Sequence, residues 1–151
     1  MTLSRRIFGI ASVSIREHEN TLLAANNYAN SLYELKRFKE ARSLLRKTIP
    51  AARRVLGEGH RLTLTMRWNY AQTLCENPCA TLKNLRESVT TFEEVKRTMR
   101  RVLGGTHPDT MAIEIALRQA RAKLGAREEA APDDVSSVCK GVAAMRTPGD
   151  A

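Results

Sequence analysis

Apolar residues recur at every third or fourth position through most of the chain, and Gly or Pro interrupts this pattern only at intervals. Such spacing is typical of amphipathic α-helices. It predicts helices over residues 20–35, 38–55, 62–74, 82–102 and 108–124. The chain is therefore predicted to be all-α.

A short signature recurs at the junctions between the predicted helix pairs. Its three His residues are followed by Thr and an apolar residue three and four positions on, and they are His18, His60 and His107. The copies are separated by 42 and then 47 residues, and the extra five fall in a predicted loop after Leu74. Periods of this length indicate a helical repeat array, which presents a binding surface rather than a catalytic pocket.

Local signals mark the ends of the predicted helices. Gly57 follows the second helix and is predicted to end it. Pro50 lies inside the same helix, so a bend or break is expected near Ile49. The three signature histidines are predicted to cap helices rather than to bind a metal, because a whole repeat separates each from the next.

The pattern divides the chain into three parts. Residues 17–124 form the predicted repeat domain, and residues 125–151 lack a periodic apolar face and are predicted to be a mostly disordered tail. Residues 1–16 are interpreted as a degenerate preceding helix or a flexible N-terminus. Their three arginines and lack of acidic residues leave a targeting segment open.

Charge narrows the choice of partner. The formal net charge is +9, and residues 17–124 hold 19 basic and 11 acidic residues. This excess predicts an acidic partner, which charge alone leaves open as an acidic peptide, a nucleic acid or an anionic membrane surface. No apolar run approaches the length of a membrane span, and the three cysteines come without a secretory signal, so a cytoplasmic protein is expected.

The phased motifs resemble tetratricopeptide repeats, specifically the longer type found in kinesin light chains. The resemblance rests on the His-Pro-Asp-Thr at His107, the Asn-Tyr-Ala at Asn27 and Asn69, and the Val-Leu-Gly that ends at Gly57 and Gly104. It implies antiparallel helix pairs stacked in a short right-handed superhelix. It also implies a non-enzymatic protein-interaction module that binds an extended peptide on the concave face of the first helix of each pair.

The resemblance places the peptide-binding Asn of the family at Asn27 and Asn69. Neighbouring polar and aromatic positions on the same two helices extend this candidate groove. The full set is Asn26, Asn27, Asn30, Tyr33, Arg67, Trp68, Asn69 and Gln72. Carboxamides both donate and accept hydrogen bonds, which suits peptide groups. The alternatives are that these Asn residues are only solvated helix positions and that Trp68 belongs to the core.

No catalytic or phosphate-binding motif appears, and Cys75 and Cys79 lack the second pair of ligands that a zinc site needs, so both are expected to be ordinary thiols. We expect no enzyme activity, no cofactor and no metal. A basic RNA-binding helical repeat is the alternative function, disfavoured because few aromatic residues are present to stack on bases. Self-association through Ile7, Phe8 or the last predicted helix is a further hypothesis, since two and a half repeats are close to the minimum for stability.

Overall fold

The computed structural model describes the backbone of residues 3–130 and the side chains of residues 14–130. Five helices make up this part of the chain, and it contains no strand. They are α1 (Leu3–Glu34), α2 (Phe38–Leu56), α3 (Arg61–Glu76), α4 (Leu82–Val102) and α5 (Pro108–Glu129). The predicted all-α fold of stacked helix pairs is confirmed.

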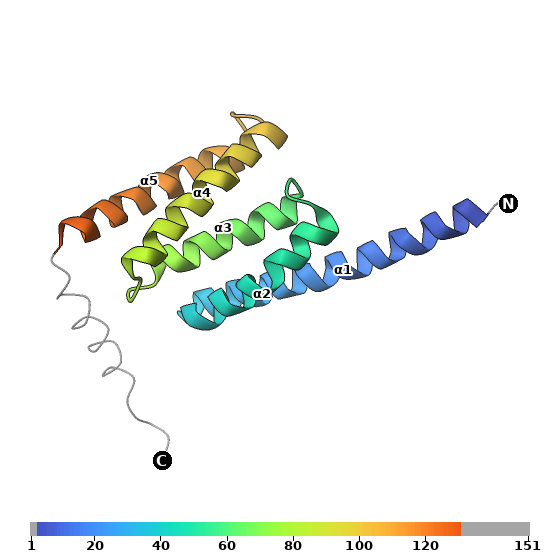
Figure 1. The fold of residues 1–151 in the computed structure, drawn as a ribbon, viewed down its shortest axis with the longest axis horizontal. Coiled ribbons are helices and arrows are strands. Elements are labelled where there is room, and N and C mark those ends of the chain that lie inside the picture. The colour runs from blue at the N-terminus through green and yellow to red at the C-terminus, as the bar shows by residue number, and fades with distance from the viewer. Residues whose placement is uncertain (1–2, 131–151) are drawn as a thin grey trace, which may run out of the picture.

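The helices form two layers (Figure 1). Each helix packs against the next one in the chain, and α3 also contacts both α1 and α5. By contrast, α2 and α4 make no contact with each other. Helices α1, α3 and α5 therefore lie side by side in one layer, which we call the A helices, and α2 and α4 form the second layer, the B helices.

Two groups of buried side chains hold the stack together, and α3 contributes to both. The first joins α1, α2 and α3 around Leu45 and Met66. The second joins α3, α4 and α5 around Leu64, Phe92 and Ile113. Each core is thus shared between adjacent repeats, which is the arrangement that makes a solenoid depend on its neighbours.

Helix α1 is longer than the apolar pattern predicts. It continues through His18, so the predicted boundary between residues 16 and 17 lies inside a helix. Its N-terminal half projects beyond the other helices in Figure 1. His18 does not cap a helix: its Nδ1 lies 2.6 Å from the carbonyl oxygen of Ser14, one turn earlier. The capping prediction is therefore wrong for His18. The side chains of Ile7 and Phe8 lie outside the described residues.

The other predicted helix ends agree well with the structure. His60 and His107 each precede a helix, and their Nδ1 atoms accept hydrogen bonds of 3.1 Å from the backbone N–H two residues later. Gly57 follows α2 with φ of 93° and Gly104 follows α4 with φ of 94°, a left-handed backbone that favours Gly. Capping is confirmed for these two histidines. Helix α2, however, runs unbroken past Pro50.

Helix α5 extends beyond the last predicted position. It passes through Gly125, where the apolar pattern fades, and ends at Glu129. The first five residues of the predicted tail are therefore helical. Residues 131–151, which make up the rest of that tail, lie outside the described part of the chain.

Candidate functional site

The A helices share one surface, on the side that faces away from the B helices. Positions 42 and 47 residues apart are equivalent in α1, α3 and α5, so each position forms a row across the three helices. We call the surface formed by the following rows the A face. The rows are Leu23, Thr65 and Ala112; Asn30, Gln72 and Gln119; and Glu34, Glu76 and Lys123. All nine residues are exposed or half-buried.

The middle row consists entirely of carboxamides. Asn30 and Gln119 are exposed, and Gln72 between them is half-buried. Neighbouring helix axes lie about 8–10 Å apart, which is close to the length of three residues of an extended chain at about 3.3 Å each. A peptide that crosses the A face therefore meets a carboxamide at about every third residue. We call these three residues the carboxamide row.

Asn26 and Asn69 lie at the junction between α1 and α3 rather than on the open surface. The Nδ2 of Asn69 donates a hydrogen bond of 2.9 Å to the Oδ1 of Asn26, and Asn26 is only 4% exposed. A buried amide needs such a partner, since leaving it unpaired costs about 1–3 kcal/mol. This pair therefore fixes how α1 and α3 sit against each other.

Tyr33 and Gln72 make a second polar bridge between the same two helices. The Nε2 of Gln72 donates to the hydroxyl oxygen of Tyr33 over 3.3 Å. Burial, followed by the negative charge of Glu76, raises the pKa of Tyr33, so the phenol stays protonated at neutral pH. The oxygen of the Gln72 carboxamide has no hydrogen-bond partner in the described residues and remains available to a ligand.

Asn27 and Trp68 occupy different surroundings. Asn27 is exposed, because no described helix covers α1 on that side. Trp68 is half-buried and packs against the second core. The structure therefore brings Asn26, Tyr33, Asn69 and Gln72 together, and leaves Asn27 at one edge of the stack. Asn30 belongs to the carboxamide row.

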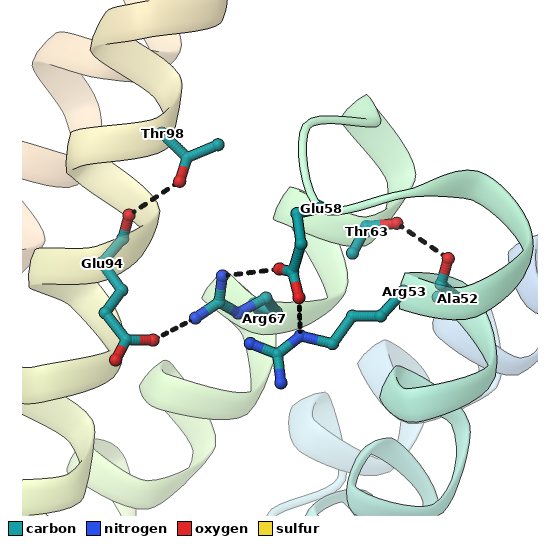
Figure 2. Close-up of polar contacts among 7 residues, drawn as sticks. All are labelled: Ala52, Arg53, Glu58, Thr63, Arg67, Glu94 and Thr98. Atoms are coloured by element: carbon teal, nitrogen blue, oxygen red, sulfur yellow. Dashed lines mark hydrogen bonds and ion pairs between the residues drawn. The ribbon is translucent and has the colours of Figure 1, made fainter.

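Arg67 lies apart from the other candidate residues, in a network of ion pairs that Figure 2 shows. Its side chain is buried on the side of α3 that faces the B helices. One nitrogen of its guanidinium contacts Glu58 at 3.3 Å, and the other contacts Glu94 of α4. Arg53 of α2 contacts the second oxygen of Glu58 at 2.6 Å. This network ties α2, α3 and α4 together, and Arg67 is not available to a ligand on the A face.

Other basic residues near the repeat junctions are also paired within the chain. Arg61 reaches Asp109 at 3.6 Å, so it links the starts of α3 and α5. Lys96 of α4 pairs with Glu114 of α5 at 3.3 Å. These contacts give Arg61 and Lys96 a structural role. Basic residues without an ion pair lie on several of the described helices, and the exposed side of α2 has five of them.

A charge pair and a buried thiol lie close together at the C-terminal end of α3. Lys123 of α5 contacts Glu76 of α3 at 2.6 Å. Burial opposes the charge on Lys123, but the hydrogen bond and charge of Glu76 outweigh it and raise the pKa of Lys123. Burial raises the pKa of the free Cys75 thiol nearby, which makes it less reactive. Cys79 is disulfide-bonded, so the expectation of an ordinary thiol is wrong there.

Comparison with known protein families found one match, in the N-terminal repeats. Residues 20–77 match the tetratricopeptide repeat family. The match covers the second half of α1 and all of α2 and α3, which is less than half of the chain. It supports a tetratricopeptide repeat protein, and it does not specify the kinesin light chain type. No curated protein and no solved structure matches the chain.

Tetratricopeptide repeats generally mediate protein–protein interaction and are not themselves enzymes. Within residues 3–130, no helix is long and apolar enough to cross a membrane. In the same part of the chain, no three His, Cys, Asp or Glu side chains are grouped closely enough to hold a metal ion.

Gln119 and Leu23 are A-face residues that the sequence analysis missed. Gln119 lies 47 residues after Gln72, the same spacing that separates His60 from His107. The 47-residue spacing finds Gln119 when it is applied to the whole of helix α5 and not only to the signature. Leu23 is 45% exposed and resembles a core position by residue type alone, so only the packing reveals it.

Proposed function

We propose that this chain is a protein-interaction module that binds an extended segment of a partner protein across the A face. The carboxamide row carries the proposal. Asn30, Gln72 and Gln119 repeat one donor-and-acceptor group at one position of three successive helices. Such a row matches the repeating N–H and C=O groups of an extended backbone, which demand partners wherever they are covered.

The neighbouring row supplies the contact for side chains of the partner. Leu23 is 45% exposed, and Thr65 and Ala112 follow it at equivalent positions. These apolar and small side chains leave room for partner side chains beside the carboxamide row. Burial of such apolar area supplies about 25 cal/mol per Å² of driving force. Backbone contacts and apolar contacts together favour a peptide over a small polar ligand.

The acidic preference expected from net charge is not supported by this face. Two of its nine residues are acidic, namely Glu34 and Glu76. Its one basic residue is Lys123, which is paired with Glu76. We therefore propose a partner segment that is neutral or mixed in charge along the carboxamide row.

An array of extended peptides tests the proposal. Peptides of about seven residues span the row, given 3.3 Å per residue. We expect some of them to bind the wild-type chain and to shift the fluorescence of Trp68, the sole tryptophan. The double substitution Asn30→Ala with Gln119→Ala should weaken their binding by about 5-fold to 150-fold, since each lost hydrogen bond is worth about 0.5–1.5 kcal/mol.

Asn20→Ala serves as the matched control, because Asn20 is an exposed carboxamide of α1 outside the row. It should leave binding unchanged. Methylating the peptide nitrogens of a binder should abolish its affinity, because its backbone donors are then removed. Binding that survives both the double substitution and the methylation would contradict the proposed mode, and an array without any binder would contradict the function.

A further inference from the structure

The exposed side of α2 carries the densest positive charge of the described residues. Helix α2 contains six basic residues and a single acidic residue, Glu40, which pairs with Arg37 just before the helix. At 100° per residue, the six basic side chains fall within an arc of about 140°. We call them the α2 stripe: Lys39, Arg42, Arg46, Lys47, Arg53 and Arg54.

The α2 stripe is open to solvent along its whole length. Five of its residues are exposed and Arg42 is half-buried. Helix α2 packs on α1 and α3 through its opposite side and does not contact α4. Only Arg53 has an acidic partner, Glu58; the remaining five form no ion pair within the described residues. Five uncompensated charges therefore line about 23 Å of one helix.

We propose that the α2 stripe binds the phosphate backbone of a double-helical nucleic acid without reading its sequence. Polyanions gain affinity by releasing counterions when cations neutralise their phosphates. Four of the six stripe residues are arginines, whose planar guanidinium groups match phosphate oxygens two at a time. Phosphate contacts carry no sequence information, so we expect the binding to be largely independent of sequence.

The composition of the stripe disfavours the other acidic partners. The cores of protein interfaces are depleted of charge and enriched in aromatic residues, whereas the exposed residues of α2 besides its basic ones are only Glu40, Ser43 and Pro50. A membrane-surface helix inserts an apolar face, but the apolar face of α2 is buried in the repeat core. Single-strand binders stack bases on aromatic side chains, and none is exposed on α2.

This surface is distinct from the A face, which lies on the other layer of the stack (Figure 1). The A face carries carboxamides and paired charges, whereas the α2 stripe carries unpaired cations. The chain thus has the means to hold a partner protein and a nucleic acid at the same time. The failure of either proposal leaves the other standing, because separate residues carry them.

Fluorescence anisotropy on the full chain tests the inference. The ligand is a labelled DNA duplex of about 20 base pairs. This is longer than the roughly eight base pairs, at 3.4 Å each, that α2 covers. Five neutralised phosphates predict a slope of about −4.5 for the logarithm of affinity against the logarithm of salt concentration. The triple substitution Arg46→Gln, Lys47→Gln and Arg54→Gln should reduce that slope by about 2.7. Circular dichroism checks that the variant is folded.

The matched control removes the same charge from α4 through Lys83→Gln, Arg97→Gln and Arg101→Gln. These three residues are also exposed and unpaired, but Glu87 and Glu94 lie between them on the same side of the helix. The control should change the slope by less than about 1. An equal effect of the two triple substitutions would show that only net charge matters and would overturn the proposal.

Three competitors complete the experiment: the single strand of the same sequence, polyglutamate of similar charge, and vesicles that contain phosphatidylserine. The duplex should bind most tightly, and the α2 substitutions should weaken it most. Tighter binding of the single strand than of the duplex would overturn the assignment to duplex nucleic acid. Tighter binding of polyglutamate or of the vesicles, if the α2 substitutions abolish it, would overturn it as well.

Discussion

Helices α3 and α5 show the same apolar pattern in two different situations. Leu64 of α3 is 1% exposed, while its equivalent in α5, Met111, is 56% exposed. Trp68 packs against the second core, whereas its equivalent Ile115 is 55% exposed. The difference arises because α4 and α5 cover α3, and no further described helix covers α5. In a repeat array, a core position becomes a surface position wherever the stack ends.

The largest difference is expected when Leu64 and its equivalent in α5, Met111, are each replaced by Ala. Leu64→Ala should lower the free energy of unfolding by about 2–5 kcal/mol, because it leaves a cavity in the second core. Met111→Ala should change it by less than about 0.5 kcal/mol, as is usual for surface substitutions. Chemical denaturation followed by circular dichroism measures both. Equal losses would show that α5 is covered as closely as α3.

The next comparison is between Arg67 and Glu114, which occupy equivalent positions in α3 and α5. Arg67→Met keeps most of the packing but leaves Glu58 and Glu94 without their buried partner. Both carboxylates are about half exposed, so we expect a loss of about 1–3 kcal/mol rather than the full cost of a buried charge.

Glu114→Gln removes an ion pair from a partly exposed side chain and should cost less than about 1 kcal/mol. Denaturation curves at low and high salt separate the two effects, because salt screens the partly exposed Lys96–Glu114 pair more than the contacts of the buried Arg67 guanidinium. If Arg67→Met proves neutral, the network of Figure 2 does not join the repeats energetically.

The signature histidines provide a smaller contrast. His60→Ala and His107→Ala each remove a side chain that accepts a backbone N–H, so each should cost about 1 kcal/mol. His18→Ala should be neutral within about 0.5 kcal/mol, because His18 lies inside α1 and Ala is a strong helix former. Thermal unfolding of the three variants compares them directly. A loss at His18 similar to the other two would contradict its position within a continuous helix.

The signature threonines give the smallest expected effect. The Oγ1 of Thr63 donates to the carbonyl oxygen of Ala52 over 3.4 Å, as Figure 2 shows. The equivalent Oγ1 of Thr110 is buried without a hydrogen-bond partner. Thr63→Val should therefore cost about 0.5–1.5 kcal/mol, whereas Thr110→Val should be neutral or stabilising. Denaturant titrations measure the free energy of unfolding of both variants. A lower free energy of unfolding for Thr110→Val would indicate that the Thr110 hydroxyl has a hydrogen-bond partner.

Repetition made much of the fold predictable. The five helices, the glycines that end α2 and α4, and two of the three histidine caps follow from local patterns that recur at fixed spacing. Local patterns failed where a longer element overrides them. His18 carries the same signature as His60, but no Gly precedes it to end a helix, and α1 continues through that position.

The candidate site was less predictable, because residue type does not reveal which neighbour a side chain meets. Asn26 and Asn69 resemble ligand-binding carboxamides by position, yet they bond to each other. Arg67 resembles a surface charge by its type, yet it is buried among acids from two other elements. Contacts between residues far apart in the chain decide both outcomes.

The sequence by itself determined the helices, their order and the repeat spacing, because helix formation depends on neighbours three and four residues away. It also placed the basic residues on one side of α2. Only the tertiary structure decided which carboxamides face solvent, which charges are paired and which apolar residues remain uncovered. The physical reason is that burial and hydrogen bonding at a repeat junction depend on side chains about 17 to 43 positions away, such as Glu87 for Tyr70 and Asn26 for Asn69.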